Sequence, residues 1–386
     1  MKKSLSKFTK TSFLYAINLM GRSIQEKYLV IESDDWGCIR MPSPEVRKKL
    51  INFGAVSPKN HYARFDTIAS DTDWNALLES LSQFRDVNGN YPVFTANFIM
   101  SNPDFEKIAE NNYQSYYYES FLETTKKYTK SINYESYLHH AIENKMFRPQ
   151  FHGREHLNVE KWLIALQRAY SPYLKAFEYN CYFVEPNSAY FNGKDIFAAL
   201  DFEDKSSWES HIQMLKEGLV LFKNYFGYDS QTYIAPNYIW SSAHEKFLFD
   251  LEVLALQGTK FRNDPTITSG VSNYRRKLRL MGHGGVNTPI NLVRNCFFEP
   301  SSGTGAAAIQ SCLRGIGIAF KCKQPAVISS HRLNFLGEHH PENRFDNLHY
   351  LKTLIQEVLK KWPDVQFISS DELLKKYQQK NFSYGS

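Results

Sequence analysis

Short apolar runs alternate along the chain with longer segments of helical spacing, and this alternation limits the folds that the chain can adopt. The apolar runs have the length of buried strands, and they cover residues 28–32, 92–100, 147–151, 232–235, 253–256, 292–298, 326–329 and 365–368. Residues 208–226 and 347–362 between them read as helices, the second with apolar residues at helical spacing. Strands that alternate with helices form parallel β/α units, so we expect either a barrel or a doubly wound sheet.

No Pro-, Gly- or Ser-rich linker divides the 386 residues, which indicates one main domain. We place this domain at residues 28–375, after an N-terminal extension of residues 1–27. Residues 111–144 interrupt the alternation and hold seven Tyr among polar residues. We interpret them as a helical insertion between the second and third strands, which serves either as structural cover or as a wall that faces a substrate.

The distribution of charge and cysteine excludes several classes of protein. The net charge is +6, but Lys and Arg are scattered among Asp and Glu, and no nucleic-acid-binding signature is present, so we expect no nucleic-acid partner. The five Cys are dispersed and never form a CxxC pair, which argues against a disulfide framework and a thiolate zinc site. Residues 1–22 lack the continuous apolar stretch and cleavage site of a signal peptide, and no run of 18 apolar residues exists. We therefore expect a cytoplasmic protein without a membrane span.

Polar residues follow four of the predicted strands, at the point where each strand ends. These residues are Asp34-Asp35, His152 to His156, Ala235 to Tyr238, and Ser329 to Arg332. Because β/α folds build their active sites at the carboxyl ends of the strands, we expect the four groups to meet.

Two of these groups have the residue types of a metal site. His152 and His156 are four residues apart, and in a helical turn both imidazoles would project from one face toward one cation. Asp34 and Asp35 are adjacent carboxylates whose side chains should point apart along a strand, so that one binds the metal and the other acts as a base. Chance surface histidines and an Asp that caps a helix are the alternatives. A site of two His and one carboxylate leaves positions open for water and substrate, as hydrolysis requires.

Three of these motifs resemble those of a known family, and they occur in that family's order. Ser33-Asp-Asp-Trp-Gly37, His152-x-x-x-His156 and Ile328-Ser-Ser-His331 are similar to the first, second and fifth motifs of the polysaccharide deacetylases (NodB homology domain, carbohydrate esterase family four). The resemblance implies a distorted (β/α)7-type barrel of parallel strands. It also implies one divalent metal, with Zn²⁺ as the first choice and Co²⁺, Mn²⁺, Ni²⁺ or Fe²⁺ as alternatives. The reaction implied is removal of an acyl group, acetyl in the first place, from a carbohydrate or polysaccharide.

The resemblance also implies a role for each matching residue. Asp35, His152 and His156 would bind the metal. Asp34 would be the catalytic base, and His331 would be the acid that protonates the departing amine or alcohol.

The other two family motifs are incomplete in this chain. The third motif is Arg-x-Pro-aromatic, and here Ile234 stands in the place of the Arg, Pro236 is retained and Asn237 replaces the aromatic residue. We predict that the backbone at Asn237 serves the oxyanion, and that Arg294 and Glu299 complete the substrate and oxyanion side, with surface ion pairs or solvated charge as the alternative. The fourth motif, an Asp-Trp element, is not found. A catalytically impaired glycan-binding protein, or a metal hydrolase acting on another sugar-containing substrate, therefore remains an alternative function. The oligomeric state is open.

Overall fold

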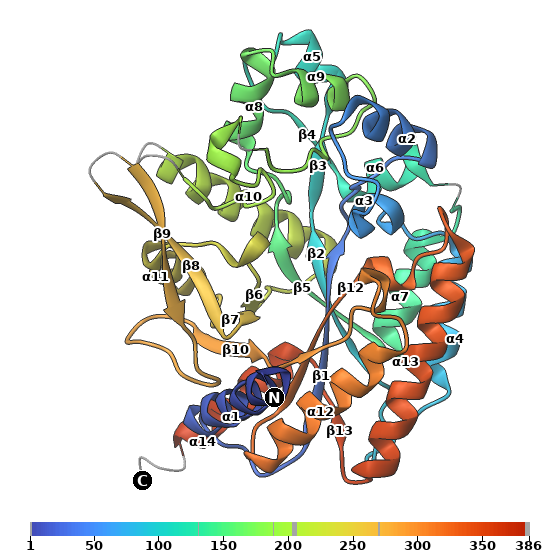
Figure 1. Ribbon diagram of the computed structural model, residues 1–386, viewed down its shortest axis with the longest axis vertical. Helices are drawn as coiled ribbons and strands as arrows, with labels where there is room; N and C mark the ends of the chain where they lie inside the picture. Colours follow the sequence, from blue (N-terminus) through green and yellow to red (C-terminus); the bar gives the residue numbers. More distant parts are fainter. Residues whose placement is uncertain (1, 130, 188, 203–206, 269–270, 383–386) are drawn as a thin grey trace.

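A sheet of parallel strands forms the centre of the computed structural model, which describes residues 2–129, 131–187, 189–202, 207–268 and 271–382 (Figure 1). In order around the sheet, starting from the first strand of the chain, the strands are β1 (Tyr28–Trp36), β2 (Phe94–Ile99), β5 (Phe147–Gly153), β6 (Thr232–Tyr233), β7 (Ala255–Thr259), β10 (Ile290–Arg294), β11 (Cys296–Phe297) and β12 (Ala326–His331). Strand β12 pairs with β1 in parallel, and the short β13 (Gln366–Phe367) pairs with the start of β1 outside this order.

One segment of chain joins the two ends of the sheet. Strand β10 pairs with β7, and after the single residue Asn295 strand β11 pairs with β12. With β10 and β11 taken as one, the sheet is a nearly closed barrel of seven parallel strand positions. The α/β fold with a distorted (β/α)7-type barrel is therefore confirmed. The distortion comes from the two-residue strand β6 and from register shifts at the ends of β1 and β2.

The strands are buried on both faces, which explains why they read as continuous apolar runs. All nine residues of β1 are buried. Leu29 and Ile31 belong to the large core shared with the helices, whereas Val30 belongs to a smaller core with Val327 and Leu373. Leu373 lies on helix α14 (Ser370–Phe382), which contacts β1, β7 and β10 near the C-terminal end of the chain (Figure 1).

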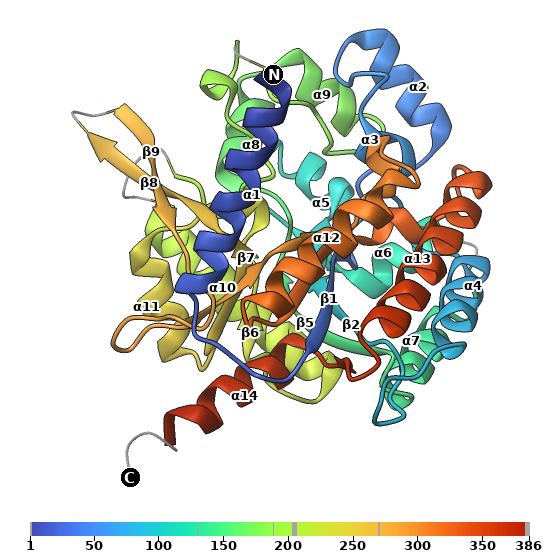
Figure 2. The same ribbon diagram turned by 60° about the horizontal axis from the view of Figure 1, so that its bottom comes forward.

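Helices connect the strands and surround the barrel. They include α4 (Asp71–Ser82), α7 (Tyr134–Glu143), α10 (Ser207–Phe226), α11 (Ser242–Asp250), α12 (Ala307–Lys321) and α13 (Pro341–Lys361). The predicted helices at 208–226 and 347–362 correspond to α10 and α13. Helix α1 (Lys2–Met20) lies beside α12 (Figure 2). Among the described residues, no helix combines the length and apolar character needed to cross a membrane.

A second layer lies at the end of the barrel toward which β1, β2 and β5 point (Figure 1). It contains α2 (Pro44–Phe53), α3 (His61–Phe65), α5 (Phe105–Glu110), α8 (Val159–Gln167) and α9 (Ser171–Phe177). These helices share their own buried core with the segment 181–197. The layer therefore forms the walls around the carboxyl ends of the strands.

Two connections between barrel strands differ from simple β/α crossovers, because each contains an antiparallel pair of strands. Between β2 and β5, strand β3 (Ser101–Pro103) pairs with β4 (Tyr118–Ser120), and α6 (Phe121–Tyr128) and α7 follow. Phe121 and Tyr134 of this Tyr-rich segment belong to the main core. Between β7 and β10, an antiparallel hairpin of β8 (Phe261–Thr268) and β9 (Val271–Leu278) is present. The sequence did not predict this hairpin because its residues are mostly polar and lack the apolar runs of the barrel strands.

Candidate active site

A cavity of about 220 Å³ lies at the carboxyl ends of the barrel strands. Asp34, Asp35, His152, His156 and His331 all line it, although they come from three different strand ends. The structure thus brings together the five residues to which the motif resemblance gave a metal-binding or catalytic role.

The end of β1 turns both of its carboxylates toward this cavity. Asp35 has φ 72° and Gly37 has φ 86°, and the register of β1 with β2 shifts between Ser33 and Trp36. A Cβ on Gly37 would lie 2.2 Å from the backbone oxygen of Ile99, so the turn requires glycine there. The two Asp side chains have separate partners, but both line one cavity, because the left-handed conformation of Asp35 breaks the strand alternation. The helix-cap alternative is also excluded for these two residues, since Ser43 caps the next helix.

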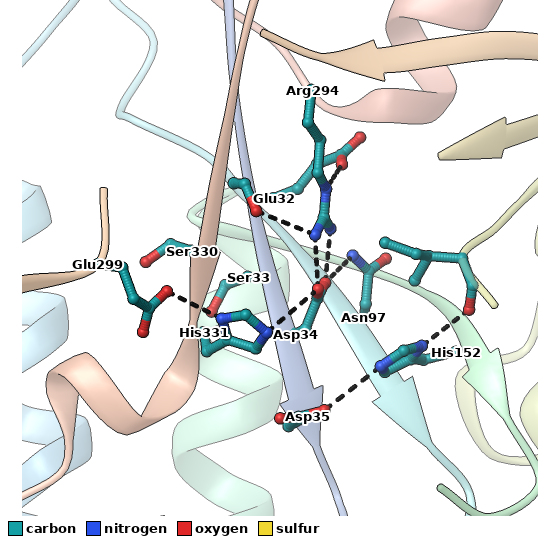
Figure 3. A network of polar contacts seen from close by, with 12 residues as sticks. Glu32, Ser33, Asp34, Asp35, Asn97, His152, Arg294, Glu299, Ser330 and His331 are labelled. Atoms are coloured by element: carbon teal, nitrogen blue, oxygen red, sulfur yellow. Dashed lines mark hydrogen bonds and ion pairs between the residues drawn. The ribbon is translucent and has the colours of Figure 1, made fainter. Parts of the chain in front are cut away.

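Asp35, His152 and His156 form a buried group that could hold a metal ion. The Nε2 atoms of His152 and His156 lie 3.3 and 3.5 Å from Asp35 Oδ1. His152 Nδ1 lies 2.8 Å from the carbonyl oxygen of Ile234, which can only accept, so Nδ1 carries a proton and Nε2 is the nitrogen that faces Asp35 (Figure 3). Burial lowers the pKa of His156 to about 3, so this ring is neutral.

The environment of Asp35 Oδ1 indicates that these residues fit a cation. This oxygen is buried and has no hydrogen-bond donor among the described residues. Nitrogens of two imidazoles and an oxygen of one carboxylate converge in this place, and an unsatisfied buried carboxylate oxygen is costly unless a cation or proton binds it. The donor set of two nitrogens and one oxygen suits zinc and other divalent transition metals.

The two histidines are brought together by a turn and not by a helix. His152 and Gly153 end strand β5, and the next helix begins only at Val159. Gly153 has φ 139°, and after it the chain turns back. The centres of the His152 and His156 rings therefore lie 5.1 Å apart. The prediction that His152 and His156 lie close together is therefore correct, but the predicted helical turn between them is absent.

Asp34 is held by Arg294 from the end of β10, whose strand position is separated from β1 by β12 alone (Figure 3). Arg294 Nη1 and Nη2 donate to the two oxygens of Asp34, both at 2.6 Å, and Asn97 Nδ2 donates to Oδ1 at 2.7 Å. The Arg294 Nε–H donates to Glu32, so this buried guanidinium pairs with two carboxylates. Burial alone would raise the pKa of Asp34, but the charge and hydrogen bonds of Arg294 outweigh it and hold that pKa at about 2.

This position of Arg294 differs from one of the two sequence-based interpretations. The side chain is fully buried, so it is neither a surface ion pair nor a solvated charge. It binds Asp34 and is not among the residues that line the cavity, so its predicted place on the substrate and oxyanion side remains a prediction. Arg294 thus places a guanidinium from β10 on both oxygens of Asp34.

His331 is held as a cation by Glu299. Its Nδ1 lies 2.8 Å from Glu299 Oε2, and its Nε2 lies 3.3 Å from Tyr62 Oη and 3.8 Å from Asp34 Oδ2. Burial lowers the pKa of His331, but the charge and hydrogen bond of Glu299 outweigh it and raise the pKa to about 9. Glu299 also accepts from Asn334 Nδ2 at 2.8 Å and does not line the cavity. The structure therefore places Glu299 behind the predicted acid, in contrast to the predicted position facing substrate.

The turn after β6 forms another wall of the cavity. Asn237 and Tyr238 both have φ 56°, and both line the cavity, whereas Pro236 is buried beside them. Asn237 Nδ2 donates to Asp195 Oδ2 at 2.9 Å. Asn237 therefore lies where a ligand would reach it, and its predicted service to an oxyanion remains a prediction.

Several residues of the cavity belong to no recognised motif. They are Arg40, Asn60, Tyr62, Phe183, Glu185, Asp195 and Phe197. Most of them come from the second layer and from the segment 181–197, which lies between α9 and α10. Their sequence neighbourhoods have no periodicity or spacing that marks them, since only folding of this layer over the barrel brings them to the cavity.

The fold and the site define an α/β barrel protein with a buried Asp-His-His group, an ionised aspartate and a cationic histidine in one cavity. No protein-family model matches the chain, and no curated protein matches it. Solved structures that resemble it include one described as a "putative polysaccharide deacetylase" from Mycobacterium smegmatis (11% identity, 92% of both chains, TM-score 0.44) and one described as a "probable polysaccharide deacetylase" from Pseudomonas aeruginosa PAO1 (9% identity, 91% of both chains, TM-score 0.45). A 4-alpha-glucanotransferase from Thermococcus litoralis is similar over 92% of this chain and 40% of its own (8% identity, TM-score 0.44). Similarities at this level do not assign the chain to a family.

Proposed function

We propose that this protein is a metal-dependent hydrolase that removes an acyl group, acetyl in the first place, from a carbohydrate. The observation that carries the proposal is the meeting of Asp35, His152 and His156 with Asp34 and His331 in one cavity. Zn²⁺ is the proposed metal, with Co²⁺, Mn²⁺, Ni²⁺ and Fe²⁺ as alternatives that the same ligand atoms accept.

A divalent metal at Asp35, His152 and His156 would polarise an acyl carbonyl and lower the pKa of a bound water. The protein's own groups supply the proton transfers. His331 has a pKa of about 9, so at neutral pH its Nε2 carries a proton on the cavity side. It is placed to donate this proton to the departing amine or alcohol. Glu299 on Nδ1 keeps the ring oriented and balances its charge.

Asp34 is the proposed base, and its environment defines how it acts. A general base works best when its pKa lies near the working pH, whereas the pKa of Asp34 is held at about 2. Asp34 is therefore anionic throughout the physiological range. We propose that it accepts a hydrogen bond from the attacking water and orients it, and that it receives the water's proton only as the water bonds to the carbonyl carbon, before the proton passes to solvent.

The carbohydrate part of the proposal rests on the motif resemblance, and the lining of the cavity supports it. Tyr62, Phe183 and Phe197 offer ring faces and edges, which suit the apolar faces of a sugar. Glu185 and Asp195 offer carboxylates, which accept hydrogen bonds from hydroxyl groups. A mixed lining of this kind suits a ligand that is rich in hydroxyl groups.

The alternative of an impaired, glycan-binding protein depended on the missing arginine at Ile234. Arg294 binds both oxygens of Asp34, so the proposed base does not lack a guanidinium. This contact favours the enzyme over the binding protein.

The proposal is tested by metal content and by release of acetate. Purified wild-type protein should hold about one divalent metal per chain, and Asp35→Ala and His152→Ala should lose it, because each removes one of three ligands. His283→Ala, in an exposed loop, is the matched control and should keep the metal. Retention of full metal by the Asp35 and His152 variants would show that the metal site is wrongly assigned.

Activity is measured on a panel of acetylated mono- and oligosaccharides with added zinc, cobalt or manganese. Wild type should release acetate, and Asp34→Asn should release it at least 100-fold more slowly, since the amide cannot accept the water's proton. Equal background rates for both proteins across the whole panel would favour the glycan-binding alternative.

A further inference from the structure

Arg40 binds the oxygen of Asp35 that faces away from the two histidines. Its Nη2 donates to Asp35 Oδ2 at 2.8 Å, and both side chains are almost entirely buried. The other oxygen, Oδ1, is the one that His152 Nε2 and His156 Nε2 approach. The two oxygens of this carboxylate therefore have separate partners.

Arg40 is itself fixed from the side opposite Asp35. Its Nε lies 3.1 Å from Asp66 Oδ2, and Arg332 Nε donates to the other oxygen of Asp66 at 2.9 Å. The four side chains form a buried row of alternating charge. Because the side chains of Asp66 and Arg332 are both buried, they hold the guanidinium of Arg40 in one position.

Aromatic rings pack around the head group of Arg40, which also lines the cavity. Its guanidinium carbon lies 4.5 Å from the centre of the Tyr62 ring, 5.1 Å from that of Phe197 and 5.9 Å from that of Phe183. These distances are within the range of cation–π attraction. Arg40 thus has a charged partner on two sides and rings around the rest of its head group.

We propose that Arg40 is a positioning residue of the metal centre, which restricts Asp35 to a single ligand oxygen, Oδ1. This inference rests on the metal site of the proposed function. With Oδ2 occupied by Arg40, the chain presents three ligand atoms, namely Oδ1 and two imidazole nitrogens. The remaining coordination positions are then left to water and substrate, as a catalytic site requires.

Arg40 has two opposing effects on metal affinity, and a substitution that tests its role must separate them. Its positive charge repels a bound cation, whereas its hydrogen bond orients the ligand carboxylate. Arg40→Lys keeps the charge but loses the fork that reaches Asp35 and Asp66 at once. This variant therefore removes the orientation and leaves most of the repulsion.

The test measures the transfer of zinc from the full-length, zinc-loaded protein to a chelating dye. Arg40→Lys should bind zinc 10- to 100-fold more weakly than wild type, which is the usual loss when a partner of a metal ligand is removed. Arg332→Lys is the matched control, because it disturbs the same buried row but does not touch Asp35. It should lower the melting temperature comparably and change zinc affinity by no more than about threefold.

Zinc-edge X-ray absorption of wild type and of Arg40→Gln reports the number of oxygens that Asp35 contributes. Wild type should bind zinc through one carboxylate oxygen, and Arg40→Gln, in which Oδ2 is released, should allow two. Unchanged or tighter zinc binding by Arg40→Lys, an equal loss in Arg332→Lys, or two-oxygen binding in wild type would each overturn the role of Arg40. Failure of wild type to bind any divalent metal would overturn the metal site and this role together.

Discussion

At the scale of single residues, each of the two neighbouring carboxylates has an arginine of its own. Asp34 pairs with Arg294 and Asp35 pairs with Arg40. Burial would raise the pKa of both carboxyl groups, but in each case the guanidinium outweighs it, and both pKa values are lowered. Two adjacent aspartates can therefore both be ionised inside a buried site, where they would otherwise repel each other. The charges that the proposed chemistry needs are in place before a substrate binds.

His331 leads to a prediction about pH. An acid must hold its proton, so activity of the metal-loaded enzyme should fall as the pH rises through the pKa of His331, which the charge and hydrogen bond of Glu299 raise. Glu299→Gln removes the anion that raises this pKa, and the alkaline limb should move down by at least one pH unit. The measurement is kcat/KM as a function of pH at saturating metal.

The control for this variant is Glu338→Gln, an exposed carboxylate on the loop after the His331 strand. It should leave the alkaline limb in place. An unshifted limb in Glu299→Gln would mean that His331 is not the group that titrates.

At the scale of elements, the site depends on backbone that departs from strand geometry where the strands end. Asp35 has φ 72°, Gly153 has φ 139°, and Asn237 and Tyr238 each have φ 56°. Such conformations cost free energy and persist where surrounding structure imposes them, often at functional sites. Here they turn side chains from β1, β5 and β6 into one cavity. The regular alternation of a strand would direct half of these side chains elsewhere.

The turn at Gly153 provides a prediction at this scale. Gly153 has φ 139°, a backbone conformation that alanine rarely adopts, and a Cβ added there would lie 3.1 Å from the backbone oxygen of Glu155. In Gly153→Ala the turn between His152 and His156 must therefore deform. We expect the free energy of unfolding to fall by about 1–3 kcal/mol and zinc affinity to fall roughly tenfold or more. Urea unfolding and zinc transfer to a chelating dye measure the two effects.

Gly54→Ala is a matched control, because Gly54 also has a positive φ, 81°, but ends a helix and has nothing within 4 Å of the added Cβ. It should lower stability by about 1 kcal/mol and leave zinc affinity unchanged. If Gly153→Ala also kept its zinc affinity, the turn would not be what brings the two histidines together.

At the scale of the whole molecule, the barrel is joined where the chain passes from β10 to β11. Asn295 stands between these strands, and its backbone N–H donates to the carbonyl of Val327 at 3.1 Å. Its side-chain Oδ1 accepts from the N–H of Val327 at 2.9 Å, and its Nδ2 donates to the carbonyl of Pro325 at 2.9 Å. The side chain therefore takes the place of a strand partner at the join. Arg294, which holds Asp34, is the residue immediately before it.

The join between β10 and β11 can be tested by truncating Asn295, because this side chain is uncharged and its loss removes only hydrogen bonds. Asn295→Ala leaves the buried N–H of Val327 without its acceptor, so we expect the free energy of unfolding to fall by about 1–3 kcal/mol. Urea unfolding followed by circular dichroism measures this change. Asn273→Ala, on the exposed hairpin strand β9, should change stability by less than about 0.5 kcal/mol. Equal stability of the two variants would show that the Asn295 side chain does not hold the barrel together.

The sequence by itself determined those features that lie within a few residues of one another. The eight apolar runs appear as strands because burial on both faces demands continuous apolar residues. The motifs at the ends of β1, β5 and β12 meet because the carboxyl ends of parallel strands share one rim of a barrel.

Only the tertiary structure decided which charges pair with the site. Arg294 binds Asp34 across 260 positions of sequence, and this contact exists only because β10 and β1 belong to the same barrel. Arg40 is five residues from Asp35, yet its role depends on Asp66 and on rings from a separate layer. The polar hairpin of β8 and β9 shows no apolar periodicity, so its strands are defined by pairing with each other. Spacing along the chain encodes local geometry, whereas pairing of buried charges is set by which elements pack together.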